Sequence, residues 1–136
     1  MIIDCPPALG GITRSALMAS DICLLPTRPN AADIWALDEM IQLVQDAQSF
    51  NERLQGGWII ATQQPPRSKG ADLGVSHLEE LASTEGVELF NSGTNSRVTY
   101  SNSMLCGSAP TLYEPQSKAA SEVRAIVDEL LERISQ

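Results

Sequence analysis

The first residue that could carry out chemistry is Asp4, which ends the apolar run Met1 to Ile3. Such a run predicts the end of a buried strand, which would fix the carboxylate at the edge of a sheet. There the carboxylate could hold Mg²⁺, directly or through water, beside the phosphates of a nucleotide. An aspartate that only caps a turn fits the pattern equally well, so the choice between them depends on the rest of the chain.

The composition sets limits on the class of protein. The 136 residues are 43% apolar and 19% charged, which is typical of one globular domain. Seventeen acidic and 9 basic side chains give a net charge of −8, which argues against a wholly basic nucleic-acid surface but allows a local basic patch. No apolar run approaches the roughly 18 residues of a membrane span. Three cysteines without metal-like spacing fit a reducing, cytoplasmic compartment.

Short apolar runs alternate with helical stretches along the chain. After the strand end at Met1 to Asp4, strands are predicted at Ile22 to Leu25, Trp58 to Ala61 and Val87 to Phe90. Helices are predicted at Thr13 to Ser20 (with Thr13 as N-cap), Asp33 to Leu54, Leu73 to Ser83, Arg97 to Leu105 and Ala119 to Ile134. Strands that alternate with helices predict an α/β fold, a parallel sheet with helices on both faces.

Two further expectations concern packing. Ile22 to Leu25 is continuously apolar and closed by Pro26, which predicts a strand buried on both faces. Trp35 and Trp58 are both expected to be packing residues rather than stacking platforms for a ligand. In a parallel sheet ligands bind beyond the carboxyl ends of the strands, so Asp4, Pro26 and the loop after Ala61 should share one rim.

Several motifs, in order, resemble the ParA/MinD-type partition ATPases. The stretches IIDCPP, TRSAL and ASDICLLPTRP are similar to the family's Walker B strand ending in IDxPP, its T-x-x-AL helix and its strand running from Asp into proline. ATQQPPRSKG stands at the family's loop after the next strand. SRVTYSNSMLCGSAPTLYEPQSKAASEV is similar to the closing pattern R-x-x-Y…P-x-S-x-A-x-x-E. The resemblance spans essentially the whole chain.

This resemblance implies a fold and a nucleotide site. The expected fold is a single α/β domain over residues 1–136, with the mostly parallel three-layer sheet of P-loop NTPases. Asp4 would be the carboxylate on Mg²⁺. The switch loop that senses the γ-phosphate of ATP would contain Pro6, Pro7 and Gly10, and the adenine would meet Thr62, Gln63 and Gln64.

The resemblance also implies binding of DNA without sequence preference, through phosphate neutralisation by Arg67, Lys69, Arg97 and Lys118. Scattered surface charge is the alternative for these four residues. A family member would dimerise around ATP, act at the nucleoid in the cytoplasm, and hydrolyse ATP under stimulation by a ParB-type partner. No membrane contact is implied.

The chain departs from the family at the phosphate-binding loop. Family members begin with a deviant Walker A loop, KGGxGKT, whose amides and lysines cradle the phosphates. Here the double glycines are Gly10-Gly11 and Gly56-Gly57, and no GK[ST] occurs. We therefore expect a C-terminal portion that begins at the Walker B strand, inactive alone and marginally stable or self-associated.

Three functions follow from these patterns. The first is a ParA-like ATPase that uses ATP and Mg²⁺. The second is a non-catalytic module that binds DNA, a partition partner or a full-length ParA-like chain. The third is an α/β domain that shares only its architecture with the family, because fold likeness by itself does not establish function.

Overall fold

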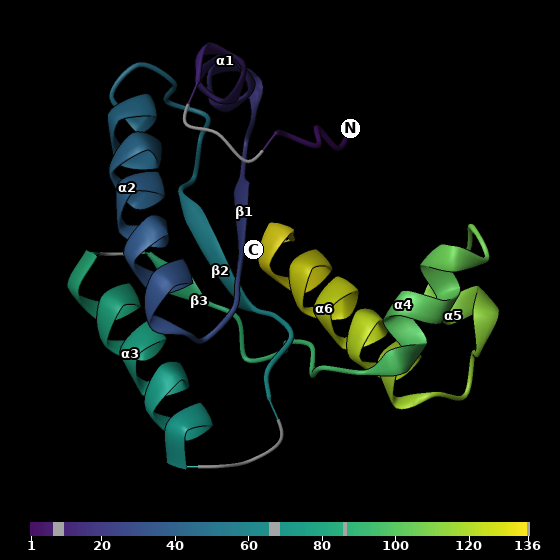
Figure 1. The fold of residues 1–136 in the computed structure, drawn as a ribbon. Helices are drawn as coiled ribbons and strands as arrows, with labels where there is room; N and C mark the ends of the chain where they lie inside the picture. Colours follow the sequence, from purple (N-terminus) through teal and green to yellow (C-terminus); the bar gives the residue numbers. More distant parts are fainter. Residues whose placement is uncertain (7–9, 66–68, 86, 136) are drawn as a thin grey trace.

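The computed structural model describes residues 1–6, 10–65, 69–85 and 87–135, and Figure 1 shows the elements in chain order. These are α1 (Gly11–Ala19), β1 (Cys23–Thr27), α2 (Ala31–Gln48), β2 (Gly57–Ala61), α3 (Lys69–Glu85), β3 (Glu88–Leu89), α4 (Val98–Leu105), α5 (Pro110–Tyr113) and α6 (Lys118–Ile134). The alternation of strands and helices confirms the predicted α/β class. The short helix α5 was not predicted.

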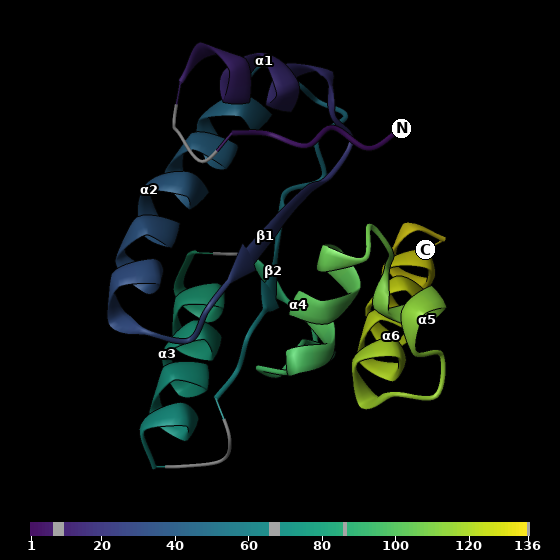
Figure 2. The same ribbon diagram turned by 45° about the vertical axis from the view of Figure 1, so that its right-hand side comes forward.

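The three strands form one parallel sheet in the order β1-β2-β3. In the register, Leu25 of β1 lies beside Ile59 of β2, and Ile59 lies beside Leu89 of β3. Figures 1 and 2 show α2 and α3 on one side of the sheet and α6 on the other. Helices therefore cover both faces of the sheet, as expected for strands joined through helices.

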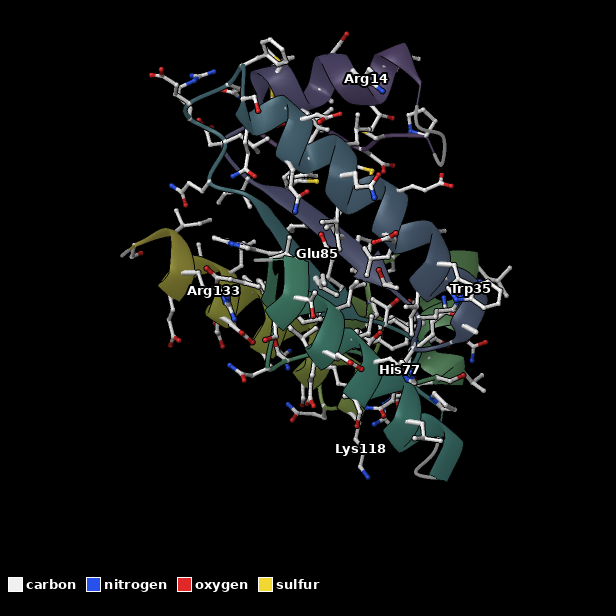
Figure 3. All side chains as sticks on the ribbon, turned by 90° about the vertical axis from the view of Figure 1, so that its left-hand side faces the viewer. Arg14, Trp35, His77, Glu85, Lys118 and Arg133 are labelled. Atoms are coloured by element: carbon white, nitrogen blue, oxygen red, sulfur yellow. The ribbon has the colours of Figure 1, made fainter. Side chains whose placement is uncertain are left out.

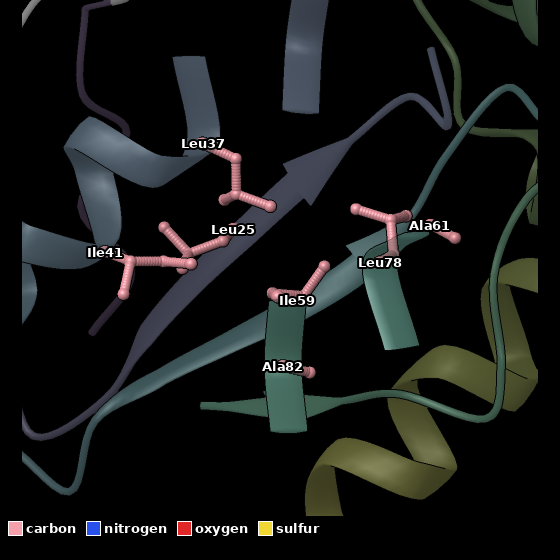
Figure 4. Close-up of a cluster of buried hydrophobic side chains, with 7 residues drawn as sticks. All are labelled: Leu25, Leu37, Ile41, Ile59, Ala61, Leu78 and Ala82. Carbon is pink, nitrogen blue, oxygen red and sulfur yellow. The ribbon is translucent and has the colours of Figure 1, made fainter. Parts of the chain in front are cut away.

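The larger core cluster lies between the sheet and helices α2 and α3 (Figure 4). Ile41 of α2, Ile59 of β2 and Leu78 of α3 meet there, and none of the three is exposed to solvent. Leu37 lies one helical turn before Ile41 and faces the same way, which is the amphipathic spacing that predicted this helix. Periodicity in the sequence thus identified the side of α2 that packs on the sheet.

The opposite face of the sheet is covered by α6. Ile126 and Leu130 of α6 pack against a cluster made by Trp58, Ile60 and Phe90. The guanidinium of Arg133 lies 4.5 Å from the centroid of the Phe90 ring, a cation–π contact. Trp58 is buried, as expected. The expectation for Trp35 is wrong, because 74% of this residue is exposed.

β1 is buried on one face only, so the prediction of a strand covered on both faces is wrong. Leu25 is 5% exposed because it faces α2. Leu24 and Pro26 lie in register with Trp58 and Ile60, on the face that α6 covers. Leu24 is nevertheless 40% exposed, because α6 packs over β2 and β3.

The predicted strand end at Met1 to Asp4 is also wrong. Residues 1–6 adopt no regular secondary structure, and Met1 and Ile2 are fully exposed. A strand requires a neighbour with which it can exchange backbone hydrogen bonds. Among the described residues, the sheet includes only β1, β2 and β3, and residues 1–4 pair with none of them.

Several helix boundaries differ from the prediction, and those of α1 and α2 have a visible reason. α1 begins at Gly11 with Gly10 as N-cap, so Thr13 lies inside the helix and is buried. α2 ends at Gln48 rather than Leu54, because the Nδ2 group of Asn51 donates to the carbonyl groups of Leu17 and Ser20. These contacts hold the turn after α2 against α1. β2 begins at Gly57, one residue before the predicted start of this strand at Trp58.

Candidate functional site

A pocket of about 780 Å³ runs along β1 to its carboxyl end, and we call it the rim pocket. Residues 24–28, in and after β1, line the pocket together with residues 33, 36, 37, 39 and 40 of α2. The rest of the lining comes from residues 5–6, from Thr13 of α1 and from residues 62–63 after β2. Parallel α/β sheets bind ligands at such strand ends. The rim pocket is therefore the candidate site.

The rim pocket brings together some of the predicted nucleotide-site residues. Pro6 lines it, and so do Thr62 and Gln63. Asp4 is exposed and lies two residues before Pro6, outside the lining. Gly10 is the N-cap of α1, and the remaining switch-loop candidate, Pro7, lies outside the described residues.

The loop after β2 is held by backbone hydrogen bonds. The Thr62 N–H donates to the Thr27 carbonyl at 2.8 Å, which ties the loop to the end of β1. The Gln63 N–H donates to the Thr94 hydroxyl at 3.0 Å, and the Gln64 N–H donates to the Thr94 carbonyl at 2.8 Å. Gln63 has a φ of +49°, a conformation that a non-glycine residue adopts only when its surroundings impose it. These contacts give the loop a defined shape beside the pocket.

Gln64 lies apart from its two neighbours. Its side chain lines a second, smaller pocket of about 390 Å³ between α3 and the segment after β3. The Nε2 group of Gln64 is directed back toward the Ala61 carbonyl, at 3.5 Å. The three candidate base contacts are thus divided between two pockets.

An ion pair at the end of β1 was not predicted as part of the site. Arg28 donates through Nε to Oδ2 of Asp33 at 2.5 Å, and Asn30 donates to the same oxygen at 2.9 Å. Asn30 also caps α2, because its side chain accepts from the Asp33 N–H. The hydrogen bond from Arg28 is the main reason that the pKa of Asp33 is lowered. The sequence signal for this pair is the stretch PTRP, which contains Arg28 and is followed by Asp33.

The closing motif R-x-x-Y…E forms one hydrogen-bonded cluster. Arg97 donates through Nε and Nη2 to Oε1 of Glu122, at 2.8 and 2.6 Å. The Tyr100 hydroxyl donates to the other carboxylate oxygen at 2.9 Å, and Asn95 donates to both oxygens. Burial opposes the charge on Glu122, but the hydrogen bonds from Arg97 and Asn95 outweigh it and lower its pKa. The motif therefore fastens α6 to the segment that precedes α4.

The basic residues proposed for DNA lie in different situations. The Arg97 guanidinium is engaged by Glu122, as described above. Lys118 is exposed and begins α6; Figure 3 shows it at the far end of the molecule from Arg14. Arg67 lies outside the described residues, and of Lys69 the structure describes only its backbone position at the start of α3.

A second carboxylate fastens α6 to the segment after β3. Glu129 accepts from the backbone N–H groups of Asn91 and Ser92, from the Ser92 hydroxyl and from Arg133. Burial opposes its charge, but these hydrogen bonds outweigh that effect and lower the pKa of Glu129 from 4.5 to about 2. The sequence carried no signal for the contact with the segment after β3, because Asn91 and Ser92 are 38 and 37 residues away from Glu129.

Glu129 should make the stability of the protein depend on acid pH. Because its pKa is lower in the folded chain than in the unfolded chain, its contribution is complete above pH 4.5 and is lost as the pH falls toward 2. We expect Glu129→Gln to lower the melting temperature at pH 7 and to reduce the further drop between pH 5 and pH 3. The measurement is a melting curve at each pH. The matched variant Glu132→Gln, at an exposed glutamate on the same helix, should keep the wild-type pH profile, and identical profiles for all three proteins would contradict the assignment.

Among the described residues, no group of three or more His, Cys, Asp or Glu side chains could hold a metal ion. Magnesium typically takes one or two carboxylates and completes its shell with phosphate oxygens and water. The single exposed carboxylate of Asp4 is compatible with that role.

A parallel sheet with helices on both faces and a pocket at the strand ends are consistent with a P-loop NTPase-like α/β fold. Residues 1–56 match the family model described as an AAA domain. The chain is 28% identical to the maintenance of carboxysome distribution protein A of Halothiobacillus neapolitanus, over 96% of this chain and 59% of that protein. It is 28% identical to the sporulation initiation inhibitor protein Soj of Bacillus subtilis, over 88% of this chain and 47% of that protein.

A third relative is the chromosome partitioning protein ParA of Myxococcus xanthus, which is 29% identical over 98% of this chain and 46% of that protein. The chain spans about half the length of the curated relatives that it matches. These comparisons confirm the predicted resemblance to the ParA/MinD-type partition ATPases. In the part of the chain that the structure describes, no helix is both long enough and apolar enough to cross a membrane.

Proposed function

We propose that this chain contributes part of the nucleotide site of a ParA-type partition ATPase. The observation that carries the proposal is the rim pocket, which Pro6 lines together with Thr62 and Gln63 at the carboxyl end of β1. The names of the relatives include chromosome partitioning, which supports partition as the process. The third reading, a shared architecture alone, is less favoured because the similarity extends over nearly the whole chain.

In this proposal Asp4 holds Mg²⁺, and Thr62 and Gln63 contact the base of ATP. A threonine hydroxyl and a glutamine amide can each donate and accept hydrogen bonds, which suits the mixed edge of a base. Gln64 is proposed with them, although its side chain lines the smaller pocket. The switch loop contains Pro6, Pro7 and Gly10, and bound magnesium would supply charge neutralisation at the phosphates.

The phosphate-binding groups would come from polypeptide other than these 136 residues, since the sequence contains no GK[ST]. This observation also favours the second function for the chain by itself. Without lysines and amides that cradle phosphates, the chain would act as a non-catalytic module that binds DNA, a partition partner or a full-length ParA-like chain.

The remaining proposals concern DNA and protein partners. The complete ATPase would self-associate around ATP, bind DNA without sequence preference at the nucleoid, and respond to a ParB-type protein. Exposed Lys118, with Arg67 and Lys69, would neutralise DNA phosphates. Arg97 would contribute least, because Glu122 already occupies two of its donor groups.

The test of the ATPase proposal compares the chain alone with the chain joined by a P-loop. The purified chain should bind Mg-ATP more weakly than about 1 mM in a calorimetric titration and show no turnover. Co-purified with a polypeptide that carries KGGxGKT from a ParA-type relative, it should hydrolyse ATP. Asp4→Ala should then lower turnover by about a hundredfold or more.

The control is Asp21→Ala, since Asp21 is an exposed aspartate before β1, at the opposite end of this strand from the rim. This variant should keep wild-type turnover in the complex. Micromolar binding and Asp4-dependent turnover by the chain alone would contradict the need for a supplied P-loop. Turnover in the complex that ignores Asp4→Ala would remove Asp4 from the site.

A further inference from the structure

The smaller pocket, between α3 and the segment after β3, shares no lining residue with the rim pocket in the described part of the chain. Its volume of about 390 Å³ lies within the range of small-ligand sites. Ala61, Ala82 and Phe90 in its lining are buried, whereas Glu79 and Asn91 are exposed. The other lining residues are half-buried: Gln64, Val75, Leu89 and Ser92. The smaller pocket therefore combines a buried apolar part with polar groups that a dissolved ligand can reach.

The side-chain donors of the smaller pocket have partners, whereas several of its acceptors do not. The Nδ2 group of Asn91 and the Ser92 hydroxyl both donate to Glu129, at 3.4 and 2.6 Å. The Nε2 group of Gln64 is directed toward a backbone carbonyl group at 3.5 Å. In the described ranges, the Glu79 carboxylate and the amide oxygens of Gln64 and Asn91 accept no hydrogen bond. The groups left for a ligand are therefore hydrogen-bond acceptors.

The charge and position of these acceptors restrict the class of ligand. Glu79 is the one charged residue of the described lining, so the smaller pocket carries a negative charge that would repel phosphate groups. Glu79 belongs to α3, whereas Gln64 follows β2 and Asn91 follows β3, so the acceptors lie on different walls. Val75 and Leu89 supply apolar surface in the same lining. A complementary ligand is a cation with N–H donors at both ends of an apolar chain.

We propose that the smaller pocket binds a short aliphatic diamine. One ammonium group pairs with Glu79, the other donates to the amide oxygens of Gln64 and Asn91, and the carbon chain packs on Val75 and Leu89. An ammonium group has three donors and no acceptor, which suits a site whose unoccupied groups are acceptors. The ligand contacts the loop after β2, which also lines the rim pocket. Binding requires no nucleotide, so this proposal does not depend on the proposed ATPase function.

The test uses putrescine, a four-carbon diamine, titrated into the isotope-labelled full chain at near-physiological salt and followed by NMR. Chemical shifts should change mainly at residues 75–82 and 89–92, with a dissociation constant of about 1 mM or lower. Glu79→Gln should weaken binding at least about fivefold, because it removes the charge that pairs with one ammonium group. Butylamine, which lacks the second ammonium group, should bind at least about threefold more weakly than putrescine.

The matched control is Glu80→Gln, the same change at the next residue of α3, which is exposed and does not line the smaller pocket. It should keep the affinity for putrescine within about twofold. Equal weakening by Glu79→Gln and Glu80→Gln would overturn the proposal, because it would indicate only a general attraction of cations to an acidic chain. The absence of shifts, or shifts confined to residues of the rim pocket, would also overturn it.

Gln64→Leu tests the wall opposite Glu79. This variant should weaken putrescine binding at least about threefold, because one ammonium group loses an acceptor. It should leave the affinity for butylamine unchanged within about twofold, since the single ammonium group of butylamine pairs with Glu79. Equal effects of Gln64→Leu on the two ligands, or equal affinities of the wild-type chain for them, would overturn the bridging of the two walls. Circular dichroism shows that each variant is folded.

Discussion

Leu78→Ala should lower the free energy of unfolding by about 2–5 kcal/mol in a denaturant titration. Leu78 has no exposed surface and lies between α3 and the sheet, in the cluster that includes Ile41 and Ile59 (Figure 4). Truncation would leave a cavity bounded by these side chains, and a close-packed interior relaxes only partly to fill it. Typical domain stability is about 5–15 kcal/mol, so the loss would be a large part of the total.

The control for this prediction is Leu73→Ala, the same substitution five positions earlier on the same helix. Leu73 is 61% exposed, so its truncation should change the free energy of unfolding by no more than about 0.5 kcal/mol. Equal losses at the two positions would contradict the orientation of α3 against the sheet.

Gly74→Ala should lower the free energy of unfolding by about 2 kcal/mol or more, because the added methyl group would collide with backbone. A Cβ at Gly74 would lie 2.2 Å from the Pro29 carbonyl oxygen and 2.9 Å from its carbonyl carbon. Alanine is the better helix former by about 1 kcal/mol, but that gain is smaller than the cost of moving α3 away from the segment between β1 and α2. Thermal or denaturant unfolding measures the net effect.

The control is Gly11→Ala, the same substitution at a helix position where the added methyl group has free space. A Cβ at Gly11 would meet nothing within 4 Å, so this variant should be as stable as the wild type or slightly more stable. A Gly74→Ala variant that is also stabilised would show that α3 does not pack closely on Pro29. Gly74 lies against Pro29, and Pro29 follows Arg28, which lines the rim pocket. The packing of α3 at Gly74 therefore also affects the shape of the pocket.

Local patterns were sufficient to predict most elements. The apolar runs at β1 and β2 and the amphipathic spacing in α2 and α6 predicted those strands and helices, because a periodic apolar face must pack against something wherever it occurs. The order of motifs was sufficient for the resemblance to partition ATPases. The residues at the end of β2 could also be assigned to the rim, since parallel strands end on the same side of a sheet.

The tertiary structure was needed wherever a residue depends on a distant partner. Arg97 was a candidate for DNA, but its contact with Glu122 spans 25 residues, a separation that no local pattern reports. Met1 to Asp4 had the composition of a strand, yet strand formation depends on a neighbour that supplies hydrogen bonds.

The two tryptophans show the same division between local pattern and packing. Both were expected to be packing residues, but only Trp58 is covered by α6, whereas Trp35 is 74% exposed. Residue type and spacing indicate which side chains can be buried, but whether one is buried depends on what the rest of the chain brings against it.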